Sequence, residues 1–218
     1  MDLTNVRVGF AMTGSYCTFA EVMPQVEALV AAGADVIPII STEVAQVDTR
    51  FGTADHWRGL LKKLTGKEPV DTIVDSEPIG PKGLLDVLVI APCTGNTLSK
   101  LANAITDSPV LMAAKAHLRN NRPVVVAIST NDGLGANARN LGVLLNARNI
   151  YMVPFGQDNP TGKACSLVAN MKLIIPTIVE ALQGKQIQPI LIQSQALSDT
   201  KYVKRGDIRQ WVVTMWLS

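Results

Sequence analysis

The sequence predicts an α/β protein with a three-layer, Rossmann-like or flavodoxin-like fold, in which a parallel sheet carries helices on both faces. Two observations lead to this fold class. Aliphatic runs without polar interruption recur along the chain, as expected for strands that are covered on both faces. Segments with apolar residues at three- and four-residue spacing lie between these runs and predict helices. This alternation favours parallel strands joined by right-handed crossovers.

The predicted elements follow one another in a regular order, each strand being a β-branched or aliphatic run and each helix having an apolar face. Strands are expected at residues 6–11, 36–40, 87–91, 123–128 and 149–153. Helices are expected at residues 18–32, 98–105, 109–118, 136–145 and 163–182. The first helix carries Phe19, Val22, Met23, Val26, Leu29 and Val30 on one face. Gly33 stands directly after it, where a glycine commonly ends a helix.

Residues 43–84 interrupt this alternation. They are more polar than the rest and contain several glycines and prolines, so a short helix and a long excursion are expected there. Such a segment would serve as a lid or an interface element. At the other end of the chain, residues 194–218 have a composition of their own, with Trp211 and Trp216 in an apolar run. We therefore expect one domain over residues 1–193 and an atypical C-terminal tail over residues 194–218.

Composition and charge exclude several classes of protein. Of the 218 residues, 47% are hydrophobic and 17% are charged, which argues for a packed globular domain. A net charge of +2 gives no electrostatic reason to expect nucleic acid or a membrane as a partner. No apolar run approaches the roughly 20 residues of a membrane span. Cys17, Cys93 and Cys165 fit no zinc spacing, so no metal is expected and a reducing cytoplasm is predicted.

Small polar residues follow four of the predicted strands at the point where each strand ends. These turns are Thr13-Gly14-Ser15, Ser41-Thr42, Thr94-Gly95-Asn96-Thr97 and Ser129-Thr130-Asn131-Asp132-Gly133. Parallel strands bring their carboxyl ends to one edge of the sheet, where open α/β proteins bind ligands. Hydroxyls, backbone N–H groups and helix N-termini at one edge predict a site for a phosphate-bearing ligand. The alternative is that each turn holds only helix caps and turn residues.

The ligand is expected to be a mononucleotide with a single phosphate. The first turn, Gly9 to Gly14, does not follow the G-x-G-x-x-G pattern of dinucleotide sites. No acidic residue ends the second strand, where Ser41 stands. The G-x-x-x-x-G-K-[ST] pattern of nucleoside triphosphate sites is also absent from the sequence.

One longer motif resembles a known family. Residues 91–107, APCTGNTLSKLANAITD, are similar to the A-P-x-[ST]-A-N-T-x-x-K-x-A-N-G-x-x-D motif of the flavoprotein family of flavin-containing cysteine decarboxylases. Gly95 replaces the Ala of that motif, Ala104 replaces its Gly, and Asp107 is kept. The turn Met12-Thr13-Gly14-Ser15 and Ser41 also agree with the family. The order of elements agrees as well, and the resemblance covers residues 1–193.

The resemblance implies an FMN site. Gly14 and Ser15 would bind the phosphate, Thr13 belongs to the same turn, and Ser41 would add a hydroxyl. Thr94, Gly95, Asn96 and Thr97 would lie beside the ribityl chain and the isoalloxazine ring. These eight residues are the expected cofactor-binding residues.

Two features depart from the decarboxylases. Their P-x-M-N-x-x-M-W substrate loop aligns with residues 128–135, where the Asn is kept as Asn131 and the Trp has become Gly135. Their His has no counterpart, because Pro78-Ile79-Gly80-Pro81 occupies its region. Within the family, residues 126–163 and 180–192 are instead similar to the B subunit of a two-subunit enzyme of sporulating bacteria that makes a pyridine dicarboxylate.

That similarity implies an oxidoreductase acting on CH–CH bonds, which oxidises a dihydrodipicolinate-type ring together with an A subunit, in the mother-cell cytoplasm. It would bind FMN and form homo-oligomers, and NADP would be placed on the partner subunit. Asn131 and Asp132 are the expected catalytic residues. The expected substrate-binding residues are Asn131, Gly135, Arg139 and Lys163. Two alternatives stay open, namely an FMN-dependent decarboxylase of the same fold and a non-catalytic flavin-fold subunit of a complex.

Other chemically interesting residues are expected to have structural roles. Cys93 lies in the third turn, where a small residue is required, and no redox role is expected for it. His56 is expected to pack at the surface beside Trp57, and His117 to be a partly exposed residue near a helix end. Met152 and Met171 stand at positions typical of a core.

Overall fold

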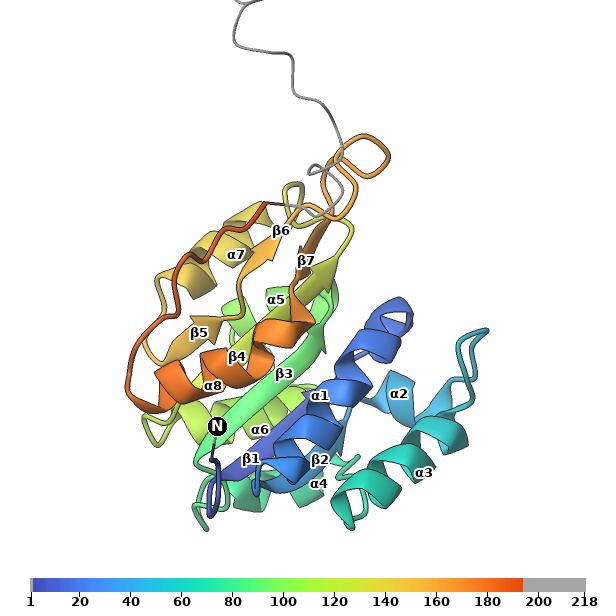
Figure 1. Cartoon of the computed structure of the whole chain (residues 1–218), viewed down its shortest axis with the longest axis vertical. Helices are drawn as coiled ribbons and strands as arrows, with labels where there is room; N and C mark the ends of the chain where they lie inside the picture. The colour runs from blue at the N-terminus through green and yellow to red at the C-terminus, as the bar shows by residue number, and fades with distance from the viewer. Residues whose placement is uncertain (1, 194–218) are drawn as a thin grey trace, which may run out of the picture.

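The computed structural model describes residues 2–193, which form a seven-stranded sheet between two layers of helices (Figure 1). The strand order is β2-β1-β3-β4-β7-β6, and β5 also pairs with β4. The strands are β1 (Arg7–Met12), β2 (Asp35–Ile40), β3 (Val87–Cys93), β4 (Val124–Thr130), β5 (Ile150–Met152), β6 (Phe155–Gly156) and β7 (Leu167–Ala169). The α/β fold class and the five predicted strands are therefore confirmed.

The sheet is mixed rather than wholly parallel, which corrects one part of the prediction. Strands β1 to β5 are parallel, whereas β7 runs antiparallel to both β4 and β6. The helix predicted at residues 163–182 is wrong in its first half: β7 and a 3₁₀ turn (Met171–Leu173) precede helix α8 (Ile174–Leu182). The short apolar run Leu167–Ala169 pairs with the end of β4, and periodicity alone does not separate such a run from a helix.

Helices cover both faces of the sheet, as predicted (Figure 1). One face carries α1 (Phe19–Ala31) and α8, and α3 (Ala54–Thr65) lies beside α1. The opposite face carries α4 (Ile73–Ser76), α5 (Gly95–Ala102), α6 (Pro109–Leu118) and α7 (Ala138–Leu145). Helix α1 ends before Gly33, whose φ of 85° lies in the left-handed region that glycine adopts without strain.

Residues 43–84 were expected to form one short helix and a long excursion, and the structure instead has several helices there, joined by short loops. The segment contains α2 (Thr42–Gln46), α3, α4 and a 3₁₀ turn (Glu77–Ile79). In α3, the Thr53 side chain accepts a hydrogen bond from the His56 backbone, and Gly66 ends the helix at a φ of 71°. Trp57 is buried and meets the Phe19 ring edge-on, with 4.9 Å between the ring centroids. Such contacts join the segment to α1 and the core.

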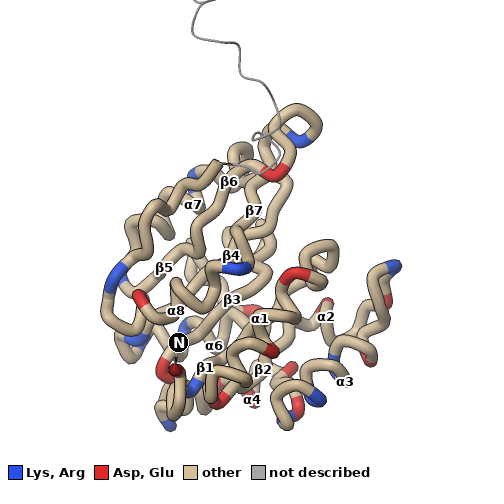
Figure 2. The backbone as a smooth tube through the Cα atoms, in the orientation of Figure 1, with Lys and Arg blue, Asp and Glu red and all other residues tan. Residues whose placement is uncertain are grey.

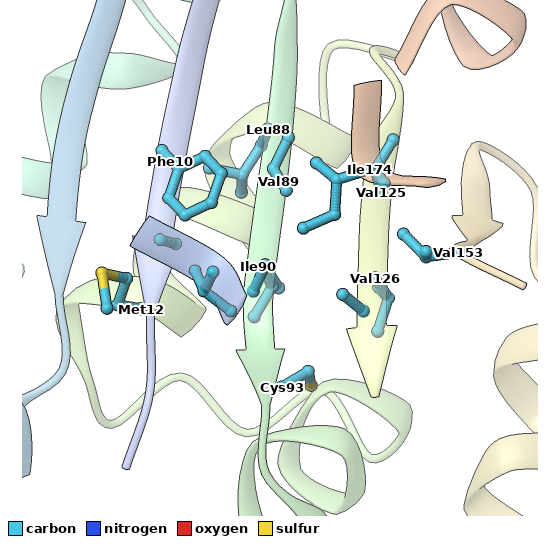
Figure 3. Packing of buried hydrophobic residues seen from close by; sticks show 14 of the residues in the cluster. Phe10, Met12, Leu88, Val89, Ile90, Cys93, Val125, Val126, Val153 and Ile174 are labelled. Atoms are coloured by element: carbon cyan, nitrogen blue, oxygen red, sulfur yellow. The ribbon is translucent and has the colours of Figure 1, made fainter. Parts of the chain in front are cut away.

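The core lies between the sheet and its helices, and its centre is built from the predicted strand runs. Figure 3 shows buried side chains of β1, β3 and β4 together with Ile174 of α8. Cys93 is fully buried in this core, and burial raises the pKa of its thiol, which keeps it protonated. Met152 and Met171 are each 1% exposed. The structural roles expected for these three residues agree with their burial.

Charged residues of both signs are interspersed over the fold (Figure 2). Of the helices in residues 2–193, none is both long and apolar enough to cross a membrane. Within the same residues, no group of three or more His, Cys, Asp or Glu side chains is placed to hold a metal ion.

His117 is buried, contrary to the partly exposed position expected from the sequence. Its side chain lies at the end of α6 and is 1% exposed, and its Nε2 atom has no hydrogen-bond partner among the described residues. Burial and the nearby Arg122 guanidinium lower the pKa of His117 to about 4. The imidazole is therefore neutral in the folded protein near pH 7.

This depressed pKa predicts a loss of stability in acid. The neutral His117 makes its full contribution to the free energy of unfolding above about pH 6.5, the ordinary pKa of an unfolded histidine. This contribution falls as the pH drops from about 6.5 to about 4, by roughly 3 kcal/mol in total, because the unfolded chain binds the proton more readily. The measurement compares urea unfolding of the wild type with that of His117→Leu between pH 7 and pH 4. Curves that stay parallel would contradict the prediction.

Candidate functional site

Three helices point their N-termini toward one cavity at the carboxyl edge of the parallel strands. Ser41 caps α2 by accepting from the Val44 N–H, and Thr94 caps α5 by accepting from the Thr97 N–H at 3.2 Å. Ser108 caps α6 in the same way, through the Leu111 N–H at 3.3 Å. The cavity between them has a volume of about 290 Å³. Its lining is Thr13, Gly14, Tyr16, Ser41, Glu43, Val47, Thr94, Asn96, Thr97, Lys100, Ser108 and Leu111.

Six of the eight residues expected to bind the cofactor line this cavity, namely Thr13, Gly14, Ser41, Thr94, Asn96 and Thr97. The remaining two, Ser15 and Gly95, stand next to lining residues in the chain. The turns after β1, β2 and β3 thus meet at one place, as the prediction of a shared edge requires. Residues 13–15 and 94–97 are separated by about 80 positions in sequence, and the parallel pairing of β1 with β3 brings them together.

Several of these hydroxyls also have structural roles. The Thr13 hydroxyl donates to the Pro92 carbonyl at 2.6 Å and accepts from the Thr94 N–H at 3.0 Å, so it ties the first turn to the third. Ser41 and Thr94 are helix caps, as the alternative interpretation of these turns holds. A cap and an anion site are compatible, because the N–H groups at the starts of α5 and α6 still favour negative charge in front of them.

Four polar lining residues were missed by the sequence reasoning: Tyr16, Glu43, Lys100 and Ser108. The Tyr16 hydroxyl donates to the Glu43 carbonyl at 2.9 Å, and burial raises the pKa of Tyr16. The Lys100 ammonium is 2.8 Å from the Asp107 carboxylate and brings a cation to the cavity. Ser108 followed by a proline is a recognisable helix start, but only the fold places α6 beside the turn after β2.

The turn after β4 contacts the first turn through two hydroxyls. Ser129 and Ser15 lie with their oxygens 2.7 Å apart, and Ser129 is 6% exposed. Ser15, which was expected to bind phosphate, is thereby attached to the strand that leads to Asn131 and Asp132. The expected cofactor side and the expected substrate side of the site are therefore adjacent.

Asp132 is held by two side-chain donors. One carboxylate oxygen accepts from the Thr130 hydroxyl, and the other accepts from the Asn137 amide at 2.8 Å. The hydrogen bond from Thr130 lowers the pKa of Asp132 against the opposing effect of burial, and the bond from Asn137 lowers it further. Asp132 is thus ionised at neutral pH. The neighbouring Asn131 is exposed. Asn137 was not singled out from the sequence.

The expected substrate-binding residues lie outside the cavity, around the same turn. The Leu134 N–H donates to the Cys165 carbonyl at 3.0 Å, which brings the loop containing Lys163 beside Gly135. The Lys163 ammonium is 3.5 Å from the Asp158 carboxylate, and about half of its side chain is exposed. Arg139 is exposed on the first turn of α7. The fold therefore gathers Asn131, Gly135 and the Lys163 loop on one side of the sheet edge.

A larger groove of about 580 Å³ lies elsewhere, between α1 and strands β6 and β7. Its lining includes Glu21, Asp158, Asn170 and Lys172 and none of the predicted site residues. We therefore take the smaller cavity, with its three capped helices, as the candidate site.

Fold and site together define an α/β protein with a cavity, bordered by three capped helix N-termini, at the carboxyl edge of its parallel strands. The sequence profile of the Flavoprotein family matches residues 1–192, and the chain belongs to this family. It is 53% identical over 198 residues to the B subunit of dipicolinate synthase from Bacillus subtilis (strain 168), a match covering 91% of this chain and 99% of the relative.

Solved structures agree with this assignment. The crystal structure of the B subunit of dipicolinate synthase from Bacillus halodurans has a TM-score of 0.82 and 53% identity, covering 89% of this chain and all of the relative. DmrB of Burkholderia xenovorans, solved in complex with FMN, has a TM-score of 0.59 at 20% identity, covering 82% of this chain and 96% of the other. The second likeness shows the shared fold.

Proposed function

We propose that this chain is the flavin-binding B subunit of dipicolinate synthase, which oxidises a dihydrodipicolinate-type intermediate to dipicolinate for the bacterial spore. The observation that carries the proposal is the 53% identity to the B subunit of a dipicolinate synthase along 99% of its length. The capped cavity supports it, because the turns that form it are those expected to bind a flavin phosphate. A decarboxylase is not favoured, since the identity to the FMN-dependent cysteine decarboxylase SpaF is 21%.

FMN is the proposed cofactor, and the residues present fit it. The cavity combines hydroxyls, the N-termini of α5 and α6 and the Lys100 ammonium, which suits a phosphate ester with a polyol chain. Its volume is near the lower end of the roughly 300–1,000 Å³ usual for small-molecule pockets, so the ring would extend beyond it. Thr13, Gly14, Ser15 and Ser41 would hold the phosphate end, and residues 94–97 would lie along the ribityl chain and the ring. Bound FMN would supply a hydride acceptor.

The protein's own residues would position the substrate and receive a proton. Aromatisation of the ring removes one hydride and one proton, and it supplies driving force for both. A weak base is therefore sufficient, and Asp132, which is ionised at neutral pH, is the candidate acceptor. Asn131 would contact the substrate, and Gly135 would leave room for a flat ring. Arg139 and Lys163 are the candidate cations for its two carboxylates.

The A subunit of dipicolinate synthase is the proposed partner, with NADP as a cofactor on that subunit. We place the complex in the mother-cell cytoplasm and expect this chain to form homo-oligomers. Because this chain by itself would supply the flavin site, FMN binding is testable without the partner, whereas turnover is tested on the co-expressed complex.

The test begins with flavin binding. The purified chain is expected to carry flavin absorbance, or to quench FMN fluorescence on titration with FMN. Co-expressed with the A subunit, it is expected to convert the dihydropyridine dicarboxylate to a product with the ultraviolet band of a pyridine. A colourless protein that does not respond to FMN would overturn the proposal. Release of carbon dioxide in place of the pyridine band would point to a decarboxylase.

Replacing Asn96 with alanine tests the ring end of the cavity. Asn96 is exposed and lines the cavity beside the capping residue Thr94. If its amide binds the flavin, Asn96→Ala should weaken FMN binding by about 1–3 kcal/mol, because the flavin group that it pairs with would be buried in the complex without a partner. A purely local role in helix α5 would lower the melting temperature and leave the affinity unchanged. Fluorescence titration alongside thermal melting separates these outcomes.

A further inference from the structure

A line of hydrogen-bonded amides runs from α5 through α7 and ends on Asp132. The Asn103 amide donates to Asn140 at 3.2 Å, the Asn140 amide donates to Asn137 at 2.8 Å, and the Asn137 amide donates to Asp132 at 2.8 Å. Asn137 and Asn140 are each 6% exposed. All three amides donate in the same direction, toward the carboxylate, and hydrogen bonds in such a line polarise one another.

Asn137 is attached to Asp132 twice. Besides the side-chain bond, its backbone N–H donates to the Asp132 carbonyl at 3.2 Å. With the Thr130 hydroxyl on the other carboxylate oxygen, the Asp132 side chain is held from two sides. The turn over residues 131–135 is therefore oriented by donors from Thr130, at the end of β4, and from Asn137, at the start of α7.

The Thr130, Asp132 and Asn137 side chains pack against the start of α5. A Cβ atom built on Gly95 would lie 2.5 Å from the Thr130 oxygen and 2.8 Å from both the Asn137 nitrogen and an Asp132 oxygen. A methyl group at those distances would force the Thr130, Asn137 and Asp132 side chains to shift, so glycine keeps this contact as it is. Gly95 is the first residue of α5 and belongs to the turn that lines the cavity. The amide line thus sets where the turn after β4 meets the cofactor turn.

We propose that Asn137 is a positioning residue, which orients Asp132 and the turn over residues 131–135 against Gly95 and so places the substrate side of the site relative to the cofactor side. This inference rests on the proposed function for its consequence in turnover. Asn137 is not among the residues that line the cavity, so it acts through Asp132 rather than on the cofactor.

The first test replaces Asn137 with leucine, which has similar volume but neither donates nor accepts. The titration of the Asp132 carboxyl carbon is followed by NMR in the flavin-free protein, with Asp132→Asn identifying the resonance. Its midpoint is expected to move to higher pH in Asn137→Leu, because a donor to the ionised form is lost. The matched control is Asn146→Leu, an exposed residue at the other end of α7, which should leave the midpoint unchanged. An unchanged midpoint in Asn137→Leu would overturn the proposal.

Turnover provides the second readout. In the co-expressed complex, Asn137→Leu is expected to lower kcat/KM for the dihydropyridine dicarboxylate about tenfold, as is common when a partner that orients a functional group is removed. The dissociation constant for FMN should not change. An equal loss of FMN affinity would indicate general damage to the domain and contradict a positioning role. If the wild type binds no FMN, the proposed function fails, while the carboxyl titration still decides the orientation of Asp132.

Gly95→Ala disturbs the same contact from α5 rather than from Asn137. It keeps the proposal testable if Asn137→Leu folds poorly. Its methyl group would displace Asn137 and Asp132, so the Asp132 midpoint is expected to rise in this variant also. Gly59→Ala is its control, because a Cβ atom there meets no atom within 4 Å. A Gly95→Ala protein with the wild-type midpoint and wild-type turnover would overturn the proposal.

Discussion

Replacing Ser15 with aspartate is expected to abolish FMN binding. Ser15 lies in the half-buried turn after β1, and its hydroxyl is 2.7 Å from that of Ser129. An aspartate there would set a carboxylate against the phosphate. Two unit charges about 4 Å apart repel by about 4 kcal/mol at an effective dielectric of about 20, which corresponds to roughly a thousandfold loss of affinity.

The matched control is Ser15→Asn, which has nearly the shape of aspartate without its charge. Both variants lose the hydroxyl that meets Ser129, so a difference between them reports the charge alone. Fluorescence titration with FMN gives the affinities, and thermal melting of the flavin-free proteins shows whether both are folded. Equal FMN affinities for the two variants would remove this turn from the phosphate site.

Replacing Gly135 with tryptophan is expected to block turnover by about a hundredfold or more while leaving FMN bound. The decarboxylases that the sequence resembles carry tryptophan at this position, and the glycine leaves room for a flat ring. A lost near-attack geometry of the reacting atoms has an effect of this size. The phosphate turn belongs to other strands, so FMN affinity should stay at the wild-type value.

Backbone strain at residue 135 would be the main confounding factor in this experiment, and the structure excludes it. Gly135 does not have the positive φ that only glycine tolerates well, and the nearest atoms to an added Cβ are the Asp132 carbonyl at 3.5 Å and Cys165 at 3.8 Å. Gly135→Ala should therefore fold, bind FMN and turn over normally, and it is the control. Full activity of Gly135→Trp in the complex would place the substrate elsewhere.

Much of the lining of the candidate cavity could be predicted from local sequence. Each strand and the turn after it are contiguous in the chain, and parallel strands bring such turns to one edge wherever they pair. This is why Thr13, Gly14, Ser41, Thr94, Asn96 and Thr97 were identified and why they line one cavity. The motif at residues 91–107 added the class of ligand, because it is long and specific.

Other elements could not be predicted in this way. Ser108 lines the cavity because α6 packs against α5 and β2, and its contact with β2 joins segments about 70 positions apart that no local pattern encodes. Asn137 and Asn140 look like ordinary helix residues in the sequence, and their bonds to each other and to Asp132 are local. Only the packing of α7 on α5 adds Asn103 to the line and sets Asp132 against Gly95. Residues 167–169 form an antiparallel strand because they pair with Ser129 and Thr130, the end of β4 beyond its pairing with β5.

The sequence by itself determined the α/β class, the five parallel strands and the polar turns that follow them, because buried strands and capped helices follow from local apolar pattern and turn chemistry. The predicted tail, residues 194–218, lies outside the described residues. Only the tertiary structure decided that three helix N-termini share one cavity and that Asp132 is held against Gly95. It also decided that His117 is buried. The physical reason is that such contacts join residues distant in the chain, whose burial and hydrogen-bond partners depend on how whole elements pack.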